Sequence, residues 1–470
     1  MLFPTYQFLI FFIIIFSIGI SWKKDVVRYK IFLLIVSCVF YGFWSWQFLG
    51  LLILCTIINY LFLIPLAQKK SNFVLIVALI FNIGYLGIFK YYNFFINSLL
   101  ENLTTLKIPE NLTTLQIFAP LGVSFYIFRI ICHLIDSYQQ KIPHPSFINY
   151  TTYITYFPQI ASGPITRAPE FYQQLNTPNR YDYKIEQVIV LILSGLFKKY
   201  TLSSFLFNFT QLPFKLPHNY SSFDLTLSAI AYSCLIYVDF SGYSDLANAI
   251  SSLLGFAPIQ NFNMPYRSRS LQEFWQRWHI SLSEWLRDYL YIPLGGNRKG
   301  KIRQYLNLIL TMLIGGFWHG AGLNFILWGG LHGIGLIINH TWKKLTRHWE
   351  IPSETFGSRL LNFLSWFLTF TFITGTWIFF NTSSWENALN FCQGIFTSDI
   401  KRVTFNMWQL YAVFIIVASM NLYGNQISQS LMIVLSLKNV FFRVAIVSGF
   451  VYGILMLGPS TIPPFIYFGF

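Results

Sequence analysis

The chain has 470 residues, of which 54% are hydrophobic and only 10% are charged, and its formal net charge is +15. Soluble domains average about 25% charged residues, so this composition excludes a set of soluble domains and predicts a polytopic protein in a lipid bilayer. On a soluble chain the positive charge would suggest nucleic acid. Here the basic residues lie between apolar runs, so membrane topology explains them and no nucleic-acid partner is expected.

Apolar segments long enough to cross a membrane recur along the whole chain. A spanning helix needs about 20 mostly apolar residues. The sequence predicts such helices at approximately 3–21, 31–46, 48–67, 73–91, 118–136, 186–206, 225–240, 305–318, 323–341, 360–381, 407–424 and 440–458. We expect about 11 to 13 membrane helices in one all-α transmembrane domain over residues 1–470, with a catalytic core at roughly 118–345.

The basic residues predict how these helices are oriented. No basic residue precedes the first apolar segment and no small-residue cleavage site follows it, which favours a spanning helix over a cleaved signal peptide. Basic clusters lie at 23–30, at 69–70 and within 262–303. Because basic residues concentrate on the cytoplasmic side, these clusters predict an extracytoplasmic N-terminus and a cytoplasmic 262–303 block.

Two stretches are too irregular or too polar to span. Residues 145–180 carry Pro158, Gly163 and Pro164 among aromatic residues, and irregular backbone at membrane depth must be shielded by protein or face water. This stretch is predicted to be re-entrant or interfacial. In 255–300 the large apolar residues recur at helical spacing, which predicts short amphipathic helices on the cytoplasmic surface. These residues are Phe274, Trp278, Leu282 and Trp285.

Two histidines in glycine-rich apolar surroundings are the first candidates for chemistry. His319 follows Trp318 and precedes Gly320 at the end of one apolar segment, and His332 lies inside the next. An imidazole with an ordinary pKa of about 6.5 suits a general base that takes the proton of a hydroxyl nucleophile beside a thioester. The alternative for each histidine is a hydrogen-bonded packing residue.

Other ionisable residues are candidates for substrate binding or for structural ion pairs. Arg277, His279 and Arg287 would attract an anionic donor from the cytosol, or else belong to an ordinary interfacial helix. Asp239 and Asp245 would orient a histidine or pair with an arginine of the 267–287 block, and the ion pair is the favoured interpretation.

Three ionisable residues share one face of the predicted helix 118–136. Arg129, His133 and Asp136 are spaced so that their side chains point the same way along a helix. Ionisable groups at membrane depth are costly unless they face the interior of the bundle. We therefore expect this face to be buried, and the favoured interpretation is a structural network.

A series of specific motifs extends over nearly the whole chain. They are Gly122–Tyr126, Phe157–Gln159, Ser162–Pro164, Gly195–Lys199, Asp239–Asp245, Asn261–Asn263, Glu273–Ser283, Trp285–Arg298, Trp318–Ala321 and Trp328–His332. Together they resemble the bacterial branch of the membrane-bound O-acyltransferase (MBOAT) family. The likeness is greatest to the alginate, peptidoglycan and polysaccharide O-acetylation proteins, and more distant to the membrane protein of teichoic acid D-alanylation.

The resemblance implies a fold and a set of site residues. The fold would be a bundle of membrane helices, with re-entrant and interfacial helices, around a central tunnel. His319 of the Trp-His-Gly motif would be the catalytic general base, and His279 matches a second family histidine that lines the cytoplasmic approach; His332 is a further catalytic candidate. Substrate-binding candidates within or beside the motifs are Asp239, Tyr243, Asp245, Asn263, Arg269, Trp275, Arg277, Trp278, Arg287, Asn297, Trp318 and Asn324.

The same resemblance implies an activity. The enzyme would sit in a bacterial cytoplasmic membrane and move an acyl group, in first place acetyl, from a cytosolic acyl-CoA (acetyl-CoA) or acyl-carrier thioester through the tunnel. The acceptor would be a hydroxyl of an extracytoplasmic cell-surface polysaccharide, or a periplasmic acyltransferase partner that relays the group. No bound cofactor or metal is expected, because no cysteine or histidine cluster has metal-ligand spacing.

Two other functions remain open, and the chain differs from the family pattern in two places. The chain could be an exporter of D-alanyl or another acyl group of the teichoic acid type, or a non-catalytic transporter or scaffold, although the repeated halves common in transporters are absent from the sequence. The hairpin topology places His319 near the outer end of its helix, whereas the family places it within the membrane. The stretch Arg129–His133 stands where relatives usually carry small or polar uncharged residues.

Overall fold

A computed structural model describes residues 3, 5–105, 116–178, 180–346, 355–397, 407–459, 463, 465 and 466. These residues form helices and, within the described ranges, no strands. They divide into two compact units, which are considered separately below. Unit 1 comprises Met1–Tyr183 and Ala247–Ile259, and unit 2 comprises Lys184–Leu246 and Gln260–Phe470. The all-α prediction is confirmed.

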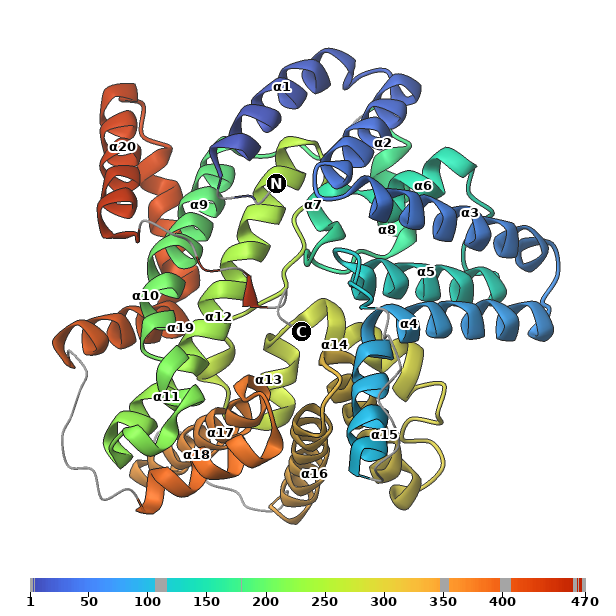
Figure 1. Cartoon of the computed structure of the whole chain (residues 1–470). Coiled ribbons are helices and arrows are strands. Elements are labelled where there is room, and N and C mark those ends of the chain that lie inside the picture. Colours follow the sequence, from blue (N-terminus) through green and yellow to red (C-terminus); the bar gives the residue numbers. More distant parts are fainter. Residues whose placement is uncertain are drawn as a thin grey trace. The chain divides into compact units, whose positions relative to one another are not determined.

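Figure 1 shows the helices, which are labelled in chain order. Unit 1 contains α1 (Tyr6–Trp22), α2 (Val26–Gly42), α3 (Trp46–Gln68), α4 (Asn72–Thr105), α5 (Val123–Tyr138), α6 (Phe147–Thr155), α7 (Phe157–Ile160) and α8 (Ala168–Leu175). The helices that follow are α9 (Ile185–Leu196), α10 (Ser203–Asn208), α11 (Gln211–Lys215), α12 (Ser222–Leu253), α13 (Leu271–Arg277), α14 (Ile280–Leu286), α15 (Lys301–His319), α16 (Leu323–Leu345), α17 (Phe356–Asn381), α18 (Trp385–Thr397), α19 (Met407–Leu435) and α20 (Val440–Leu457).

The predicted spans all coincide with helices. Among the described residues, 7 helices are long and apolar enough to cross a membrane, and Tyr6–Trp22 is a shorter apolar helix. The spanning candidates are Trp46–Gln68, Asn72–Ile96, Ile185–Asn208, Ser222–Leu253, Phe356–Asn381, Met407–Leu435 and Val440–Leu457. The remaining predicted spans correspond to α2, α5, α15 and α16, which are shorter or less apolar.

Helix α5 shows why one predicted span became an interior helix. It begins only at Val123, after Gly122 in the left-handed conformation (φ 68°), and it has 16 residues, which is about 24 Å at 1.5 Å per residue. A Cβ on Gly122 would lie 2.0 Å from the main-chain oxygen of Ile160, so glycine permits this close approach. Almost every residue of α5 is buried, so protein surrounds it within unit 1.

The ionisable face of α5 points into unit 1, as predicted. Arg129, His133 and Asp136 are all buried. Arg129 donates from Nη1 to the main-chain oxygen of Tyr153 at 3.1 Å, and the His133 Nε2 and Tyr172 hydroxyl atoms lie 2.8 Å apart. Arg129, which differs from the residues usual in the relatives, therefore lies in the interior of unit 1. Its placement at the cytoplasmic end of the helix stays a prediction.

The broken stretch 145–180 forms the short helices α6, α7 and α8, and residues 150–166 are buried. Tyr156 leaves the helical conformation (φ −47°, ψ 106°) between α6 and α7. The main-chain N–H of Phe157 instead donates to the Ser37 hydroxyl at 3.2 Å. Protein thus shields this irregular backbone, which is the condition for such a segment at membrane depth.

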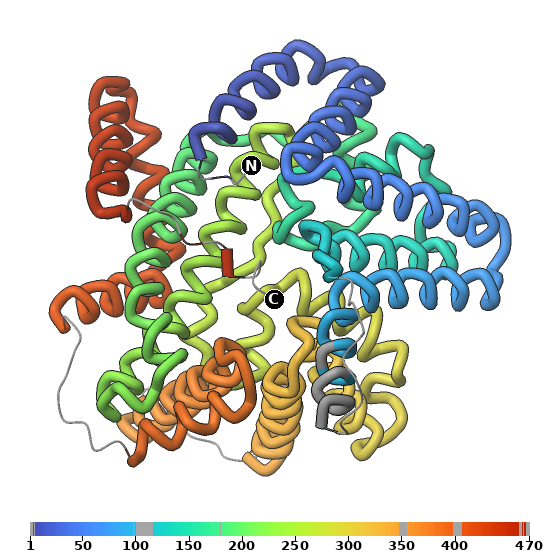
Figure 2. The backbone as a smooth tube through the Cα atoms, viewed as in Figure 1, coloured from blue at the N-terminus to red at the C-terminus, as the bar shows by residue number. Residues whose placement is uncertain are grey.

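Helix α12 supplies the core of unit 2. In its most apolar window 83% of the residues are buried, against 17% in α19 and 6% in α20. The π-helical turn Phe197–Leu202 joins α9 to α10, and Figure 2 traces these segments as one continuous rod. The apolar surfaces that α19 and α20 expose are suited to lipid contact, whereas most residues of α12 are buried.

Candidate functional site

Glycines bring α15 and α16 into close backbone contact in unit 2. A Cβ built on Gly316 would lie 2.3 Å from the Phe325 main-chain oxygen and 3.1 Å from Gly329 Cα. A Cβ on Gly329 would lie 2.2 Å from the Met312 main-chain oxygen. Small residues that let helix backbones approach are a common basis of helix packing in membranes. This hairpin positions His319 at the end of α15 and His332 in α16.

Replacing Gly329 by alanine should separate the two helices, because its Cβ would meet a main-chain oxygen that cannot rotate away. We expect a loss of about 1–3 kcal/mol in stability and a reduced acyl-transfer rate. Gly330→Ala is the matched control, since its Cβ would make an ordinary 3.5 Å contact with Leu313 Cδ2. Thermal unfolding of both variants in detergent measures the difference; equal stabilities would contradict the packing argument.

His319 is the last residue of α15 and is buried against aromatic rings. Its imidazole lies 4.7 Å from the Trp318 ring, 5.1 Å from Trp328 and 5.0 Å from Phe380, measured between ring centroids. The helix ends at Gly320, whose backbone is extended. A Cβ at this position would lie 2.2 Å from the Phe325 ring, so the glycine allows this close contact. The predicted position at a helix end agrees with the structure, and the aromatic enclosure provides a low-dielectric setting in which proton transfer is strongly influenced by neighbours.

His332 lies on the other side of Trp328, with 4.8 Å between the ring centroids. The Trp275 indole N–H, which can only donate, lies 3.3 Å from His332 Nδ1. Nδ1 is therefore the acceptor and Nε2 carries the proton, which it donates to the Thr376 hydroxyl at 3.0 Å. Thr376 in turn donates to the main-chain oxygen of Ile373 at 2.8 Å. Both ring nitrogens are thus used in a packing network, which favours the structural alternative for His332.

His279 occupies the turn between α13 and α14. It is buried and adopts the left-handed conformation (φ 41°, ψ 56°), which is uncommon for residues other than glycine. This turn separates two short helices, as the sequence predicted for this stretch. Phe274, Trp278, Leu282 and Trp285 are buried, so these side chains face protein and not the membrane surface expected of an interfacial helix.

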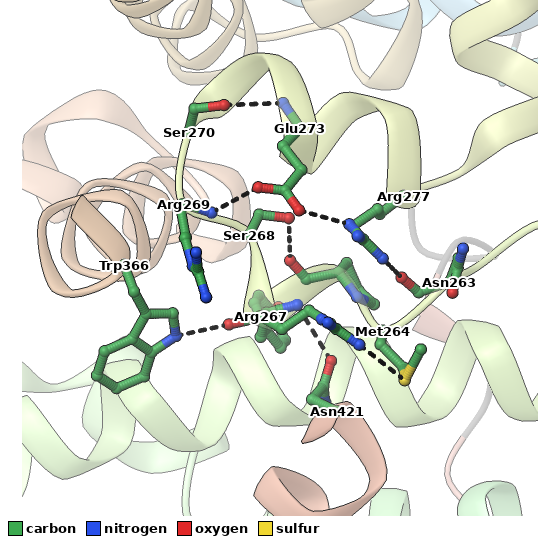
Figure 3. A network of polar contacts seen from close by, with 12 residues as sticks. Asn263, Met264, Arg267, Ser268, Arg269, Ser270, Glu273, Arg277, Trp366 and Asn421 are labelled. Atoms are coloured by element: carbon green, nitrogen blue, oxygen red, sulfur yellow. Dashed lines mark hydrogen bonds and ion pairs between the residues drawn. The ribbon is translucent and has the colours of Figure 1, made fainter. Parts of the chain in front are cut away.

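The arginines near His279 form ion pairs with acidic side chains. Arg277 Nε lies 2.9 Å from Glu273 Oε1, and Arg277 Nη1 donates to the Asn263 main-chain oxygen at 3.1 Å. Glu273 also accepts from the main-chain N–H of Arg269 at 2.9 Å, as Figure 3 shows. Arg287 is exposed and pairs with Asp288 at 2.7 Å. The predicted cluster of Arg277, His279 and Arg287 is thus not a concentrated positive centre.

Asp239 and Asp245 form ion pairs, but with lysines and not with arginines of the 267–287 block. Asp239 pairs with Lys199, and Asp245 Oδ2 lies 2.7 Å from Lys198 Nζ. Both lysines belong to the π-helical turn after α9, at the end of the Gly195–Lys199 motif. The predicted partner was wrong because sequence spacing alone did not reveal that this turn packs on α12.

The other substrate-binding candidates have different surroundings. Tyr243 is buried and stacks on Phe465 with 4.8 Å between ring centroids. Asn324 Nδ2 donates to the main-chain oxygens of Phe379 and Thr382, at 3.2 and 2.8 Å, which ties α16 to the end of α17. Asn297 and Arg269 are exposed. Trp275, Trp318 and Trp278 belong to the aromatic surroundings already described or to the buried core of unit 2.

Several residues of this region were not predicted from the sequence. Trp328 contacts the rings of His319 and His332, Phe380 contacts His319, and Trp377 packs on Trp328 and Phe380. Thr376 binds a ring nitrogen of His332, and Asn261 binds one of His279. Trp328 lies in the motif Trp328–His332 and Asn261 lies in the motif Asn261–Asn263, so these motifs could have indicated both residues as candidates. No group of three or more His, Cys, Asp or Glu residues suited to a metal occurs among the described residues.

Comparison with known proteins decides the family. The family model for MBOAT, membrane-bound O-acyltransferase family, matches residues 103–385, which is more than half of the chain. The chain belongs to this family. As an MBOAT protein it has the all-helical fold and the membrane helices that its composition predicted.

The relatives of this MBOAT protein include proteins named as acetyl and D-alanyl transferases. It is 34% identical over 409 residues to the peptidoglycan O-acetyltransferase of Helicobacter pylori, covering 80% of this chain and 75% of the relative. It is 35% identical over 416 residues to the probable alginate O-acetylase AlgI of Pseudomonas aeruginosa, covering 87% and 76%. The teichoic acid D-alanyltransferase of Streptococcus thermophilus is 32% identical over 276 residues, covering 56% and 66%. O-acyltransferase activity follows from this membership.

Proposed function

We propose that this MBOAT protein transfers an acyl group, in first place acetyl, from a cytosolic thioester to a hydroxyl outside the cytoplasmic membrane. The observation that carries the proposal is His319, a histidine of the Trp-His-Gly motif buried among aromatic rings at the end of α15. The acceptor is a cell-surface polysaccharide, or a periplasmic partner that passes the acyl group on. The names of the polysaccharide and peptidoglycan relatives support an acetyl group.

In the proposed reaction His319 is the general base. It takes the proton from the acceptor hydroxyl, whose oxygen attacks the thioester carbonyl carbon. The carbon–sulfur bond then breaks, and the leaving thiolate receives the proton from the imidazolium. An enclosed path from cytosol to exterior is needed because neither a thioester on coenzyme A or a carrier nor an external polymer crosses a bilayer. Holding the two reactants together removes much of the entropic barrier.

The donor is proposed to approach the basic block 287–303. Its exposed residues Arg298, Lys299, Lys301 and Arg303 lie just before and within the start of α15, the helix that ends at His319. Positive charge at an entrance attracts phosphate-bearing or acidic donors and raises their local concentration. The block is cytoplasmic in the topology predicted from the basic clusters, with the N-terminus outside.

The proposal is tested by measuring ester-linked acyl groups on the isolated cell-envelope glycans of the source cells with and without this gene. Mild alkali releases the acyl group, and mass spectrometry distinguishes acetate from D-alanine. Acetate lost with the gene and restored by its return supports the proposal. Loss of D-alanine would instead support the exporter of the teichoic acid type. Unchanged esters of both kinds would refute acyl transfer and favour a transporter or scaffold.

A further inference from the structure

The turn that carries His279 is held by one residue of a separate segment, Asn261. The main-chain oxygen of Asn261 accepts from the N–H of Ile280 at 2.9 Å. Its side-chain Oδ1 accepts from the N–H of Ser281 at 3.3 Å and from the Ser281 hydroxyl at 2.9 Å. The same Oδ1 lies 3.2 Å from His279 Nδ1. Asn261 is itself buried, so these contacts are protected from water.

These contacts fix which nitrogen of His279 carries the proton. A main-chain N–H can only donate, so the atom that faces Ser281 N must be the oxygen of the Asn261 amide. An amide oxygen can only accept, so His279 Nδ1 must be protonated and donate to it. In a neutral imidazole with its proton on Nδ1, the lone pair is on Nε2.

Packing and burial hold this state of the ring. The Phe240 ring meets the imidazole edge-on at 4.7 Å between centroids, and Phe262 lies nearly parallel to it at 6.4 Å. Burial lowers the pKa of His279 to about 3, so the ring is neutral at physiological pH. A left-handed backbone at a non-glycine residue is strained, and such strain tends to occur where function over-determines the geometry.

We propose that Asn261 is a positioning residue for acyl transfer, which holds His279 as the Nδ1-protonated tautomer so that Nε2 accepts a proton or hydrogen bond from the reacting groups. The inference rests on the proposed function. In this proposal His279 is a neutral hydrogen-bond acceptor and not a cation that attracts the donor. The hydrogen bonds from Asn261 and the aromatic packing around the ring favour this role.

The charged groups on the elements around His279 are paired with one another. They are Glu273 and Arg277 on α13, Asp239 and Asp245 on α12 with Lys199 and Lys198, and Glu284, Arg287 and Asp288 on and after α14. Burial is the cause of the lowered pKa of His279. A new charge at residue 261 would therefore be the main electrostatic change that the ring experiences.

The test is Asn261→Asp in the full-length protein. The carboxylate still accepts from Ser281 and His279, so the turn is retained, but its negative charge stabilises the imidazolium. The pKa of His279 should rise, so the neutral form is lost at a higher pH and the acid side of the activity profile moves up by about one to three pH units. The assay uses acetyl-CoA as donor and purified cell-envelope glycan of the source cells as acceptor.

Asn421→Asp is the matched control. Asn421 is also a buried amide in unit 2 whose Oδ1 accepts from a main-chain N–H, that of Tyr266 at 3.1 Å, and it makes no contact with the histidines. Its profile should keep the pH dependence of the unaltered enzyme. An unshifted Asn261→Asp profile in an active enzyme would overturn the role of Asn261 alone, whereas absence of acyl transfer by the unaltered protein would refute the proposed function.

A second variant covers the case in which Asn261→Asp does not fold. Asn261→Thr offers a hydroxyl that either donates or accepts, so the tautomer of His279 is no longer fixed. We expect kcat to fall at least about tenfold with KM changed by less than about twofold, the pattern of an interaction that matters in the transition state. A raised KM with unchanged kcat would show that Asn261 only supports the shape of the binding region.

Discussion

Replacing His319 by alanine should lower acyl transfer by about 10²–10⁴-fold while the protein stays folded and inserted, because a general base commonly contributes this much. The side chain lies among Trp318, Trp328 and Phe380, so its removal leaves a small cavity between these rings. Ester on the isolated glycan is measured together with the amount of protein in the membrane fraction and its unfolding temperature.

The matched control for this loss is His340→Ala. His340 lies on α16 beyond His332, and it is half-buried and makes no ring contact with His319. This variant should transfer acyl groups at the unaltered rate. Activity in His319→Ala close to that of His340→Ala would show that His319 is a packing residue and would remove the proposed mechanism.

Neutralising Asp239 should destabilise unit 2 more than any other single change proposed above. Asp239 pairs with Lys199, accepts from the Ser203 hydroxyl at 2.8 Å and accepts from the main-chain N–H of Ile466 at 3.0 Å. The side chains are only 3% and 5% exposed, so Asp239→Asn leaves a buried lysine charge without compensation. Breaking a buried pair on one side typically costs about 3–5 kcal/mol, which thermal unfolding in detergent would detect.

Asp245→Asn is the comparison, because Asp245 and Lys198 are 20% and 12% exposed and water reaches them more easily. We expect a smaller loss for this variant, about 1 kcal/mol. The double variant Lys199→Met with Asp239→Leu should recover most of the stability, since it removes both buried charges at once. An Asp239→Asn protein as stable as Asp245→Asn, with a changed KM, would instead support the substrate-binding role expected from the family motif.

Local chemistry explains why much of this protein could be predicted from the sequence. A run of about 20 apolar residues in lipid must satisfy its own backbone hydrogen bonds, so hydropathy alone located the long apolar helices. It gave no signal for the short helices α11 and α18. The same applies to the inward face of α5, because three ionisable groups at helical spacing have few other places to go. The Trp-His-Gly motif identified His319 as a candidate, because burying an ionisable imidazole in an apolar segment is energetically unfavourable and such residues are commonly functional.

Tertiary structure alone decided which groups meet. The partners of Asp239 and Asp245 are Lys199 and Lys198, which lie far earlier in the chain on a π-helical turn. The residues that neighbour the two aspartates in the sequence do not indicate such a distant ion pair. The same holds for Asn261, which binds His279 Nδ1 from a separate segment, and for the indole and hydroxyl that bind the two ring nitrogens of His332. A histidine's tautomer is set by the hydrogen bonds of its two nitrogens. The sequence therefore identified the histidines, whereas packing in three dimensions gave His279 and His332 different tautomers.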